Sequence, residues 1–331
     1  MPGWEGGRLV IILSVILALA LVAAVAVGET GLAWSQYVQA LKDPGSGAGE
    51  ILWQIRAPRA VAAALVGAAL GFAGAVLQGL LRNPLADPAV LGVSAISALG
   101  AALVIAAGLA GVPWAIEAAA LVGALVAGAI LVFLAARFEA PETLILFGVA
   151  LSALGGAATA LIFNLSPSPI ATGEVLSWLL GSVANRDFGD DAAFLVPAAL
   201  GAGLCAWSAR GLRMLTLGEE TAALSGLPMA RLRAGAVAGA ALLTGAAVSM
   251  AGVIGFVGLA APHLTRGFVR DDPAVTLAPS ALAGATLLVL GDLAARLIPT
   301  EQELKLGVVT ALFGAPLFAL VAWRAGRSWR A

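Results

Sequence analysis

Long apolar runs separated by polar breaks are the feature that most constrains the fold of this chain. A run of about twenty apolar residues is long enough to cross a bilayer as a helix, and such runs recur along the whole sequence. Only 11% of the 331 residues are charged, whereas a soluble domain carries roughly 25% charged residues. The sequence therefore predicts an all-α polytopic membrane protein.

The apolar runs predict about ten transmembrane helices in a single domain that covers residues 1–331. Two of these spans are separated by almost no polar sequence near Gly252, so nine or eleven spans remain an alternative. Either of those counts would place the two termini on opposite sides of the membrane. The expected spans are 8–28, 57–81, 91–110, 114–136, 143–163, 192–210, 234–252, 254–270, 274–296 and 304–324.

The placement of arginine and lysine predicts the orientation, because cytoplasmic loops of membrane proteins are enriched in both. If the N-terminus is cytoplasmic, twelve of these residues fall on the inner side and six on the outer side. We therefore expect a multi-pass protein of the cell inner (plasma) membrane with both termini in the cytoplasm. The six outer cations are Lys42, Arg56, Arg59, Arg186, Arg296 and Lys305.

Three polar connectors have distinct patterns. The outer loop 29–55 contains Pro-Gly-Ser-Gly and is expected to be a flexible, turn-rich connector. The next outer connector carries a segment, 171–181, that is too short to span, and we expect it to form a small surface helix over the mouth of a pathway. In the cytoplasmic loop 211–233, a short helix is expected to begin at Glu219. It would suit docking to a cytoplasmic partner, although a solvated connector is the alternative.

The stretch 56–92 places polar residues at both ends of one apolar span. Arg56 and Arg59 flank a proline at its start, and Asn83 to Asp87 form a proline-containing polar turn after it. Irregular backbone next to a membrane span is tolerated only where protein or water satisfies its polar groups. We therefore interpret the arginines as a recognition pair and the turn as part of a pathway or gate.

Several residue patterns are interpreted as structural. Gly67 and Gly71 have the small-x-x-x-small spacing that lets helix backbones approach closely, and we assign them to packing. Cys205 lies in an apolar run and is expected to be a core residue. His263 is expected to be a hydrogen-bonded structural residue near a helix end. Asp292 precedes Arg296 by four residues, which allows an ion pair along one helix.

The composition also excludes classes of function. A single cysteine rules out a disulfide framework, and one histidine without a cysteine cluster argues against a metal or haem site. Neither lysine lies in a phosphate-binding P-loop, so the chain has no such route to ATP hydrolysis. We therefore expect a protein that is not an enzyme and holds no cofactor of its own.

Several segments in order resemble one family, the permease subunits of ATP-binding-cassette importers for iron chelates, haem and cobalamin (FecCD/BtuC-like permeases). The resemblance covers nearly the whole chain. It is carried by RAPR at 56–59, the glycine-rich helix that ends at Gln78, RNPLADPAVLGVS at 82–94, LGEETAALSGL at 217–227, GFVGLAAPHLTR at 255–266, GDLAARL at 291–297 and ELKLGVVTALFGAPLF at 303–318.

The resemblance implies a set of partners. A second copy of the chain, or a close paralogue, would complete a translocation path along a shared axis. A cytoplasmic ATPase dimer would bind ATP and Mg, and a periplasmic or lipid-anchored substrate-binding protein would deliver the substrate.

The resemblance also implies roles for individual residues. Arg56, Arg59 and Arg296 match outer arginines that pair with carboxylates of the binding protein. The inner gate matches Asn83 and Leu85 in one segment and Pro141, Glu142 and Thr143 in another, although the glutamate departs from the small hydroxyl pair of some members. The helix that couples to the ATPase matches Gly218, Glu219, Glu220, Ala223, Leu224 and Gly226.

These observations predict ATP-driven import of an iron chelate, with a ferric siderophore as the expected substrate. Haem and cobalamin remain alternatives, because small apolar walls do not discriminate among these chelates. A secondary transporter driven by an ion gradient is an alternative from another class. That alternative requires carboxylates in the middle of the spans, and the sequence has none in such a series.

Overall fold

The structure, a computed structural model, describes residues 3–138, 140–166, 168–269, 272–300 and 303–328, and every regular element within them is helical. This confirms the all-α class. The elements are α1 (Gly3–Ala26), α2 (Trp34–Lys42), α3 (Gly47–Glu50), the π-helical η1 (Ile51–Arg56), α4 (Ala57–Leu80), the 3-10 turn η2 (Pro88–Leu91), α5 (Val93–Ala106), α6 (Ala115–Arg137), α7 (Pro141–Leu165), α8 (Pro169–Leu179), α9 (Phe188–Leu215), α10 (Glu219–Leu224), α11 (Met229–Ala251), α12 (Val257–Arg266), α13 (Pro273–Leu297) and α14 (Leu306–Ser328).

Seven helices within the described residues are long and apolar enough to cross a membrane. They correspond to the predicted spans other than 91–110, 254–270 and 304–324. In those three places the structure has α5, α12 and α14. α5 contains 14 residues and α12 contains ten, so both are shorter than a membrane-spanning helix requires. The count of ten spans therefore stays a prediction.

The predicted connectors contain more regular structure than their polar composition suggested. Residues 29–55 hold α2 and α3, and α3 continues through η1 into α4 as one 34-residue helix. The predicted surface helix 171–181 corresponds to α8, whose first turn is capped by Ser168 Oγ, which accepts from Ala171 N at 3.3 Å. The cytoplasmic loop contains α10 at the predicted position.

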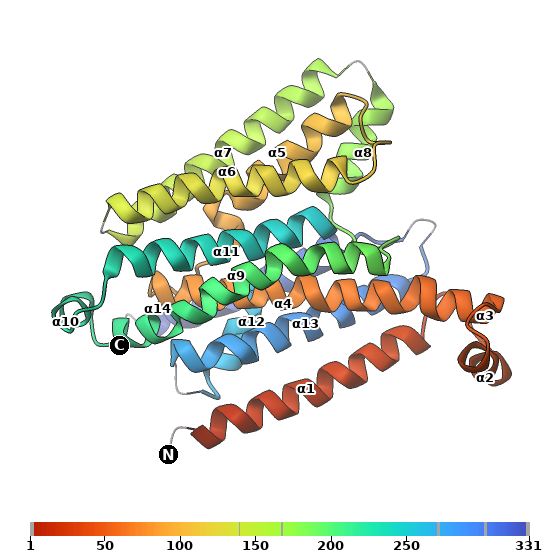
Figure 1. The fold of residues 1–331 in the computed structure, drawn as a ribbon, viewed down its shortest axis with the longest axis horizontal. Helices are drawn as coiled ribbons and strands as arrows, with labels where there is room; N and C mark the ends of the chain where they lie inside the picture. The colour runs from red at the N-terminus through yellow and green to blue at the C-terminus, as the bar shows by residue number, and fades with distance from the viewer. Residues whose placement is uncertain (1–2, 139, 167, 270–271, 301–302, 329–331) are drawn as a thin grey trace.

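The helices are arranged around α4, which packs against α13, α11, α12, α9 and α1. A second layer of α5, α6 and α7 attaches to this group chiefly through contacts between α6 and α11 (Figure 1). In Figure 1, α2, α3 and α8 lie at one end of the molecule, whereas α10 and the start of α1 lie at the other. We refer to these as the α2 end and the α10 end.

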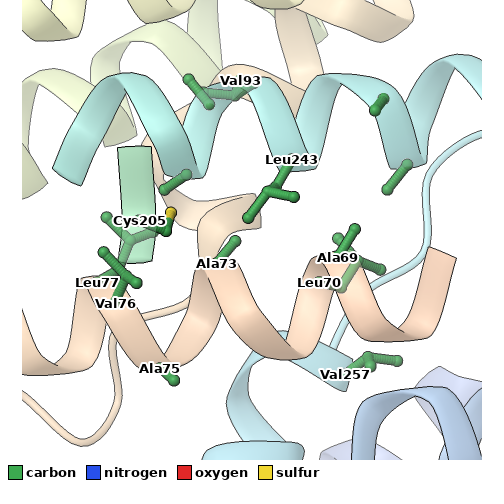
Figure 2. Packing of buried hydrophobic residues seen from close by; sticks show 14 of the residues in the cluster. Ala69, Leu70, Ala73, Ala75, Val76, Leu77, Val93, Cys205, Leu243 and Val257 are labelled. Carbon is green, nitrogen blue, oxygen red and sulfur yellow. The ribbon is translucent and has the colours of Figure 1, made fainter. Parts of the chain in front are cut away.

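Small side chains of α4 allow neighbouring helices to pack closely against it. Figure 2 shows Ala69 and Ala73 of α4 directed toward Leu243 of α11. On the opposite side, a Cβ added at Gly67 would lie 2.2 Å from the carbonyl oxygen of Gly284 in α13. Since Cβ atoms cannot approach backbone so closely, only glycine fits, and the packing interpretation of Gly67 is confirmed.

The backbone is irregular between α11 and α12, where the predicted spans were hardest to separate. Gly252 adopts φ +70° directly after α11, a backbone conformation that favours glycine. Other segments satisfy nearby polar groups, because Ser182 N donates to Ala251 O at 2.8 Å and Gly307 N donates to Gly181 O at 3.3 Å. This break shortens α12 at its start relative to the predicted span 254–270.

Candidate functional site

The three predicted docking arginines come together at the α2 end. Arg56 ends η1, Arg59 lies in the first turn of α4, and Arg296 lies in the last turn of α13. They line a common cavity of about 160 Å³. Its other lining residues are Gly28, Glu29, Thr30, Ile51, Ile55 and Glu303.

Arg59 lies between two carboxylates. Its Nε donates to both carboxylate oxygens of Asp292, at 3.0 and 3.1 Å, and its Nη2 donates to Asp292 Oδ1 at 2.8 Å. Its Nη1 donates to Glu303 Oε2 at 3.1 Å, and Nη2 also pairs with Glu303 Oε1. Charge-assisted bonds of this kind are among the stronger hydrogen bonds in proteins.

Asp292 also holds the second arginine of the group. Arg296 Nε lies 3.1 Å from Asp292 Oδ2, which confirms the predicted pair along one helix. The angle at this nitrogen does not satisfy hydrogen-bond geometry, so the contact is an ion pair. Arg296 Nη2 donates to Ala24 O of α1 at 3.2 Å, and this bond joins α13 to α1.

Arg56 is held by backbone carbonyls rather than by an acid. Its Nη1 donates to Ala26 O at 2.9 Å and to Val25 O at 3.4 Å, and its Nη2 donates to Thr30 O. The carbonyls of Val25 and Ala26 belong to the last turn of α1, where cations are favoured by the helix dipole.

The arginine cluster is consequently less exposed than a simple docking surface would be. The exposed fractions of Arg56, Arg59 and Arg296 are 4%, 8% and 6%. The three guanidinium groups lie near the carboxylates of Asp292 and Glu303 and of the exposed Glu29, so the charges of the cavity balance. Sequence reasoning identified the three arginines but missed Glu303, whose only signal was its place at the start of the segment 303–318.

At the α10 end, the polar turn after α4 is fastened by its own side chains. Asn83 Oδ1 accepts from Leu85 N at 2.9 Å, and Asp87 Oδ1 accepts from Ala89 N at 2.7 Å. Burial raises the pKa of the Asp87 carboxyl, although backbone hydrogen bonds from Ala89 and Leu259 oppose this shift. The irregular backbone of the turn is thus satisfied by protein groups.

Gln78 connects this turn to α12. Its Nε2 lies within 3.3 Å of Ala86 O and 3.5 Å of both Gly258 O and Leu259 O, and its Oε1 accepts from Arg266 Nη2 at 2.7 Å. The hydrogen bond between Gln78 and Arg266 was not predicted, because 188 residues separate the two in the sequence. A cavity of about 270 Å³ lies beside it, lined by Ala75, Gln78, Gly79, Arg82, Pro84, Thr216, Arg266, Pro273 and Thr276.

The predicted gate residues lie on two segments that contact each other at residues outside the predicted gate. Asn83 and Leu85 are half-buried in the turn after α4. At the start of α7, Glu142 is exposed and Thr143 is half-buried, whereas the side chain of Pro141 lies outside the described residues. The two segments are joined farther along, where Ser152 Oγ donates to Val90 O at 3.3 Å. The gate assignment stays a prediction.

The predicted coupling residues form a compact projection. Gly218 and Gly226 bracket α10 with φ values of +98° and +83°, Ala223 and Glu220 are exposed, and Leu224 is 90% exposed. Glu219 instead faces the protein, since its Oε2 accepts from Arg233 Nη2 of α11 at 2.9 Å. The Arg233 side chain is only 9% exposed, so this ion pair fixes α10 against the bundle.

Two other residues from the sequence pattern also have structural partners. Arg186, an expected outer cation, donates from Nη1 to Glu117 Oε1 of α6 at 2.9 Å. Cys205 is buried in the α9 face that packs on α4 and α11 (Figure 2), which agrees with its interpretation as a core residue.

Comparisons with known proteins agree with this architecture. The sequence profile of the FecCD transport family matches residues 16–324. The vitamin B12 import system permease proteins BtuC of Shigella flexneri and of Escherichia coli (strain K12 / DH10B) are each 37% identical over 322 residues, which cover 97% of this chain and 96% of theirs. A solved structure described as an inward-facing conformation of an ABC transporter of metal-chelate type superposes with a TM-score of 0.86, at 30% identity, over 96% of this chain and 99% of that one.

Proposed function

The chain belongs to the FecCD transport family, and from this premise we propose that it is the permease through which an ATP-driven importer moves a bulky metal chelate. Its membership of this family and its similarity to the BtuC permeases make it a multi-pass permease subunit of a type II ABC importer in the inner membrane.

The observation that carries the proposal is the placement of two unlike features at opposite ends of the bundle. Three arginines surround one cavity at the α2 end, and a bracketed helix with an exposed leucine projects at the α10 end. We place the α2 end outside and the α10 end in the cytoplasm, as the distribution of cations predicts.

In this orientation the arginine cluster receives a substrate-binding protein that presents carboxylates. Charge complementarity of this kind sets the orientation and rate of docking more than its affinity. At the other end, α10 fits the surface of a cytoplasmic ATPase, which supplies the ATP and Mg sites. Movement transmitted through α10 would rock the bundle, and Asn83 and Leu85, with Pro141, Glu142 and Thr143, would form the inner gate of a dimer.

Cobalamin is the first candidate substrate, because the relatives at 37% identity are vitamin B12 permeases. A ferric siderophore, predicted from the sequence, is the second candidate, since the structural neighbour is described as being of metal-chelate type. Selection between these chelates would reside in the binding protein, because the buried residues of this chain are mostly apolar and offer few groups that discriminate among chelates.

The test is uptake into proteoliposomes that contain the permease and its ATPase, with the substrate-binding protein added outside. We expect uptake of cobalamin that requires ATP and the binding protein and persists when ionophores collapse ion gradients. Siderophore-bound iron and haem are measured in parallel under the same conditions. Uptake that follows an ion gradient and ignores ATP would contradict the importer mechanism, and uptake of only another chelate would reassign the substrate.

A further inference from the structure

The arginine cavity contains a carboxylate of its own at the place where a partner's carboxylate would bind. We propose that Glu303 is an exchangeable internal carboxylate, which occupies the terminal edge of the Arg59 guanidinium in the free permease and yields it to a carboxylate of the docking protein. This inference rests on the proposed docking function and adds a regulatory step to it.

The hydrogen bonds of Arg59 show why an exchange is needed. A guanidinium has five N–H groups in a planar fork, and four of those of Arg59 are engaged by Asp292 and Glu303. Asp292 takes the edge formed by Nε and Nη2, and Glu303 takes the edge formed by Nη1 and Nη2. An incoming carboxylate can form a paired, two-bond contact with Arg59 only after one of these acids leaves.

The two acids differ in how firmly they are held. The Asp292 side chain is 2% exposed, lies within α13 and is shared with Arg296. The Glu303 side chain is 29% exposed and lies between α13 and α14, outside any helix. Removal of Asp292 would leave the buried Arg296 without an acid and the buried Arg59 with Glu303 alone, which is costly. Glu303 can move into water at little cost, so it is the acid that exchanges.

The surroundings favour a carboxylate as the entering group. Arg56 contributes a third guanidinium to the same cavity, and its contacts are with neutral carbonyl oxygens. When Glu303 leaves, the carboxylates of Asp292 and of the exposed Glu29 remain beside three arginines, so the cavity gains a net positive charge. The partner that this cavity fits is therefore a protein surface that presents an aspartate or glutamate on a short protrusion.

The exchange has a functional consequence for docking. One carboxylate replaces another on Arg59. Docking therefore gains less electrostatic free energy than it would if the arginines of the cavity were unpaired beforehand. Glu303 would keep Arg59 neutralised between transport cycles and would shorten the residence of the docked protein. The binding protein could then dissociate after it has delivered its substrate.

The test measures docking of the importer's own purified, substrate-loaded binding protein to the permease–ATPase complex in nanodiscs. Glu303→Gln keeps the shape of the side chain and removes its charge, and we expect docking to tighten about 3- to 10-fold, as for loss of a competing exposed ion pair. Affinity should also fall more steeply with salt than in the wild type, because Arg59 gains a new pair on docking. Glu50→Gln is the matched control, since Glu50 is an exposed acid of α3 at the same end of the molecule and is not among the residues that line the cavity, and it should leave both quantities unchanged.

Each other outcome decides against the proposal. In one such outcome, Glu303→Gln weakens docking or leaves it unchanged, while Arg59→Gln and Arg296→Gln abolish docking. That result would overturn the exchange and leave the docking function intact. Docking that is insensitive to both arginine variants would overturn the docking function itself. A Glu303→Gln complex that is no longer monodisperse would also overturn the exchange, because an exchangeable carboxylate must be dispensable for the fold.

Discussion

The two ends of the bundle around α4 differ in the side chains that they offer to a partner. At the α2 end, the charges of Arg59 and Arg296 are buried and already paired with Asp292. At the α10 end, Leu224 is 90% exposed, although it is an apolar side chain that gains from burial. Under the proposed function, the first end would recognise a partner by rearranging existing ion pairs, whereas the second would offer a surface that is ready for contact.

The two ends also differ in whether they would contribute mainly specificity or mainly affinity to partner binding. An exchange of carboxylates adds little net affinity but requires a correctly placed acid, so a transient partner can be selected and released. A buried apolar anchor adds affinity without exchange, which suits a partner that stays bound. We expect the arginine end to contact the binding protein intermittently and the α10 end to hold the ATPase throughout the cycle.

The largest effect is expected from a change that disrupts the packing of α4 and thereby both ends of that helix. Gly67→Val places side-chain atoms where even a Cβ would lie 2.2 Å from Gly284 O, so α4 cannot pack on α13. We expect a loss of about 4 kcal/mol or more, enough to abolish the folded permease, measured as the yield of monodisperse protein in detergent. Gly156→Val is the control, since a Cβ there meets nothing within 4 Å and the yield should remain normal. Normal yield of the Gly67 variant would contradict the packing described for α4.

A second change breaks the α2 end alone. Asp292→Asn leaves the buried guanidinium groups of Arg59 and Arg296 without their common carboxylate, and we expect the permease to lose about 3 kcal/mol of stability. The measurement is the thermal unfolding midpoint in detergent, with Glu142→Gln, an exposed acid, as the control. Binding of the ATPase to the protein that remains folded should be unchanged. An unaltered midpoint would show that Asp292 does not anchor the cluster.

A third change tests whether the α10 end acts through apolar contact. Leu224→Asp should leave the stability of the permease unchanged, because the side chain is exposed, and should weaken ATPase binding by about 2 kcal/mol, roughly 30-fold. The readout is the affinity of the ATPase for the permease in nanodiscs. Ser225→Asp adds the same charge one residue later and is the control with the smaller expected effect. Equal effects of the two variants would assign the loss to charge rather than to the apolar anchor.

The smallest predicted effect concerns the position of α10. Glu219→Gln weakens the pair with Arg233, which lies at 2.9 Å, and we expect a cost of about 1 kcal/mol. Transport-coupled ATPase activity should fall a few-fold. Glu220→Gln, in an exposed position beside it, is the comparison and should have the smaller effect. If the Glu220 variant is the more impaired of the two, Glu219 does not position the helix.

Local patterns made much of the site predictable. The segments at 56–59 and 291–297 pointed to the arginines that meet in one cavity, and the four-residue spacing predicted the pair of Asp292 with Arg296. The residues from Glu219 to Thr221 predicted where α10 begins, and Gly226 and Pro228 predicted that it ends before them. These features depend on residues close in sequence or on a family pattern, so they can be recognised without coordinates.

The remaining features depend on how distant segments meet. Glu303 contacts Arg59 across 244 residues, and its role depends on the path of a connector that has no periodic pattern. Hydropathy also could not show that the chain from Gly252 to Phe256 is irregular, because those residues are as apolar as the helices beside them. In the region 29–55, Pro-Gly-Ser-Gly predicted a flexible connector, and the helices that the structure has there escaped prediction because they are short and amphipathic or glycine-rich.

The ion pair between Arg59 and Asp292 has a consequence for how the protein is made. The arginine is synthesised 233 residues before its aspartate, and translation proceeds from the N-terminus at about 5–20 residues per second. During that interval Arg59 has neither of its acids, and its charge must be accommodated by lipid headgroups, water or the insertion machinery. The last helices to emerge therefore supply the neutralising groups for one of the first, and a chain truncated before α13 would leave this arginine uncompensated in the membrane.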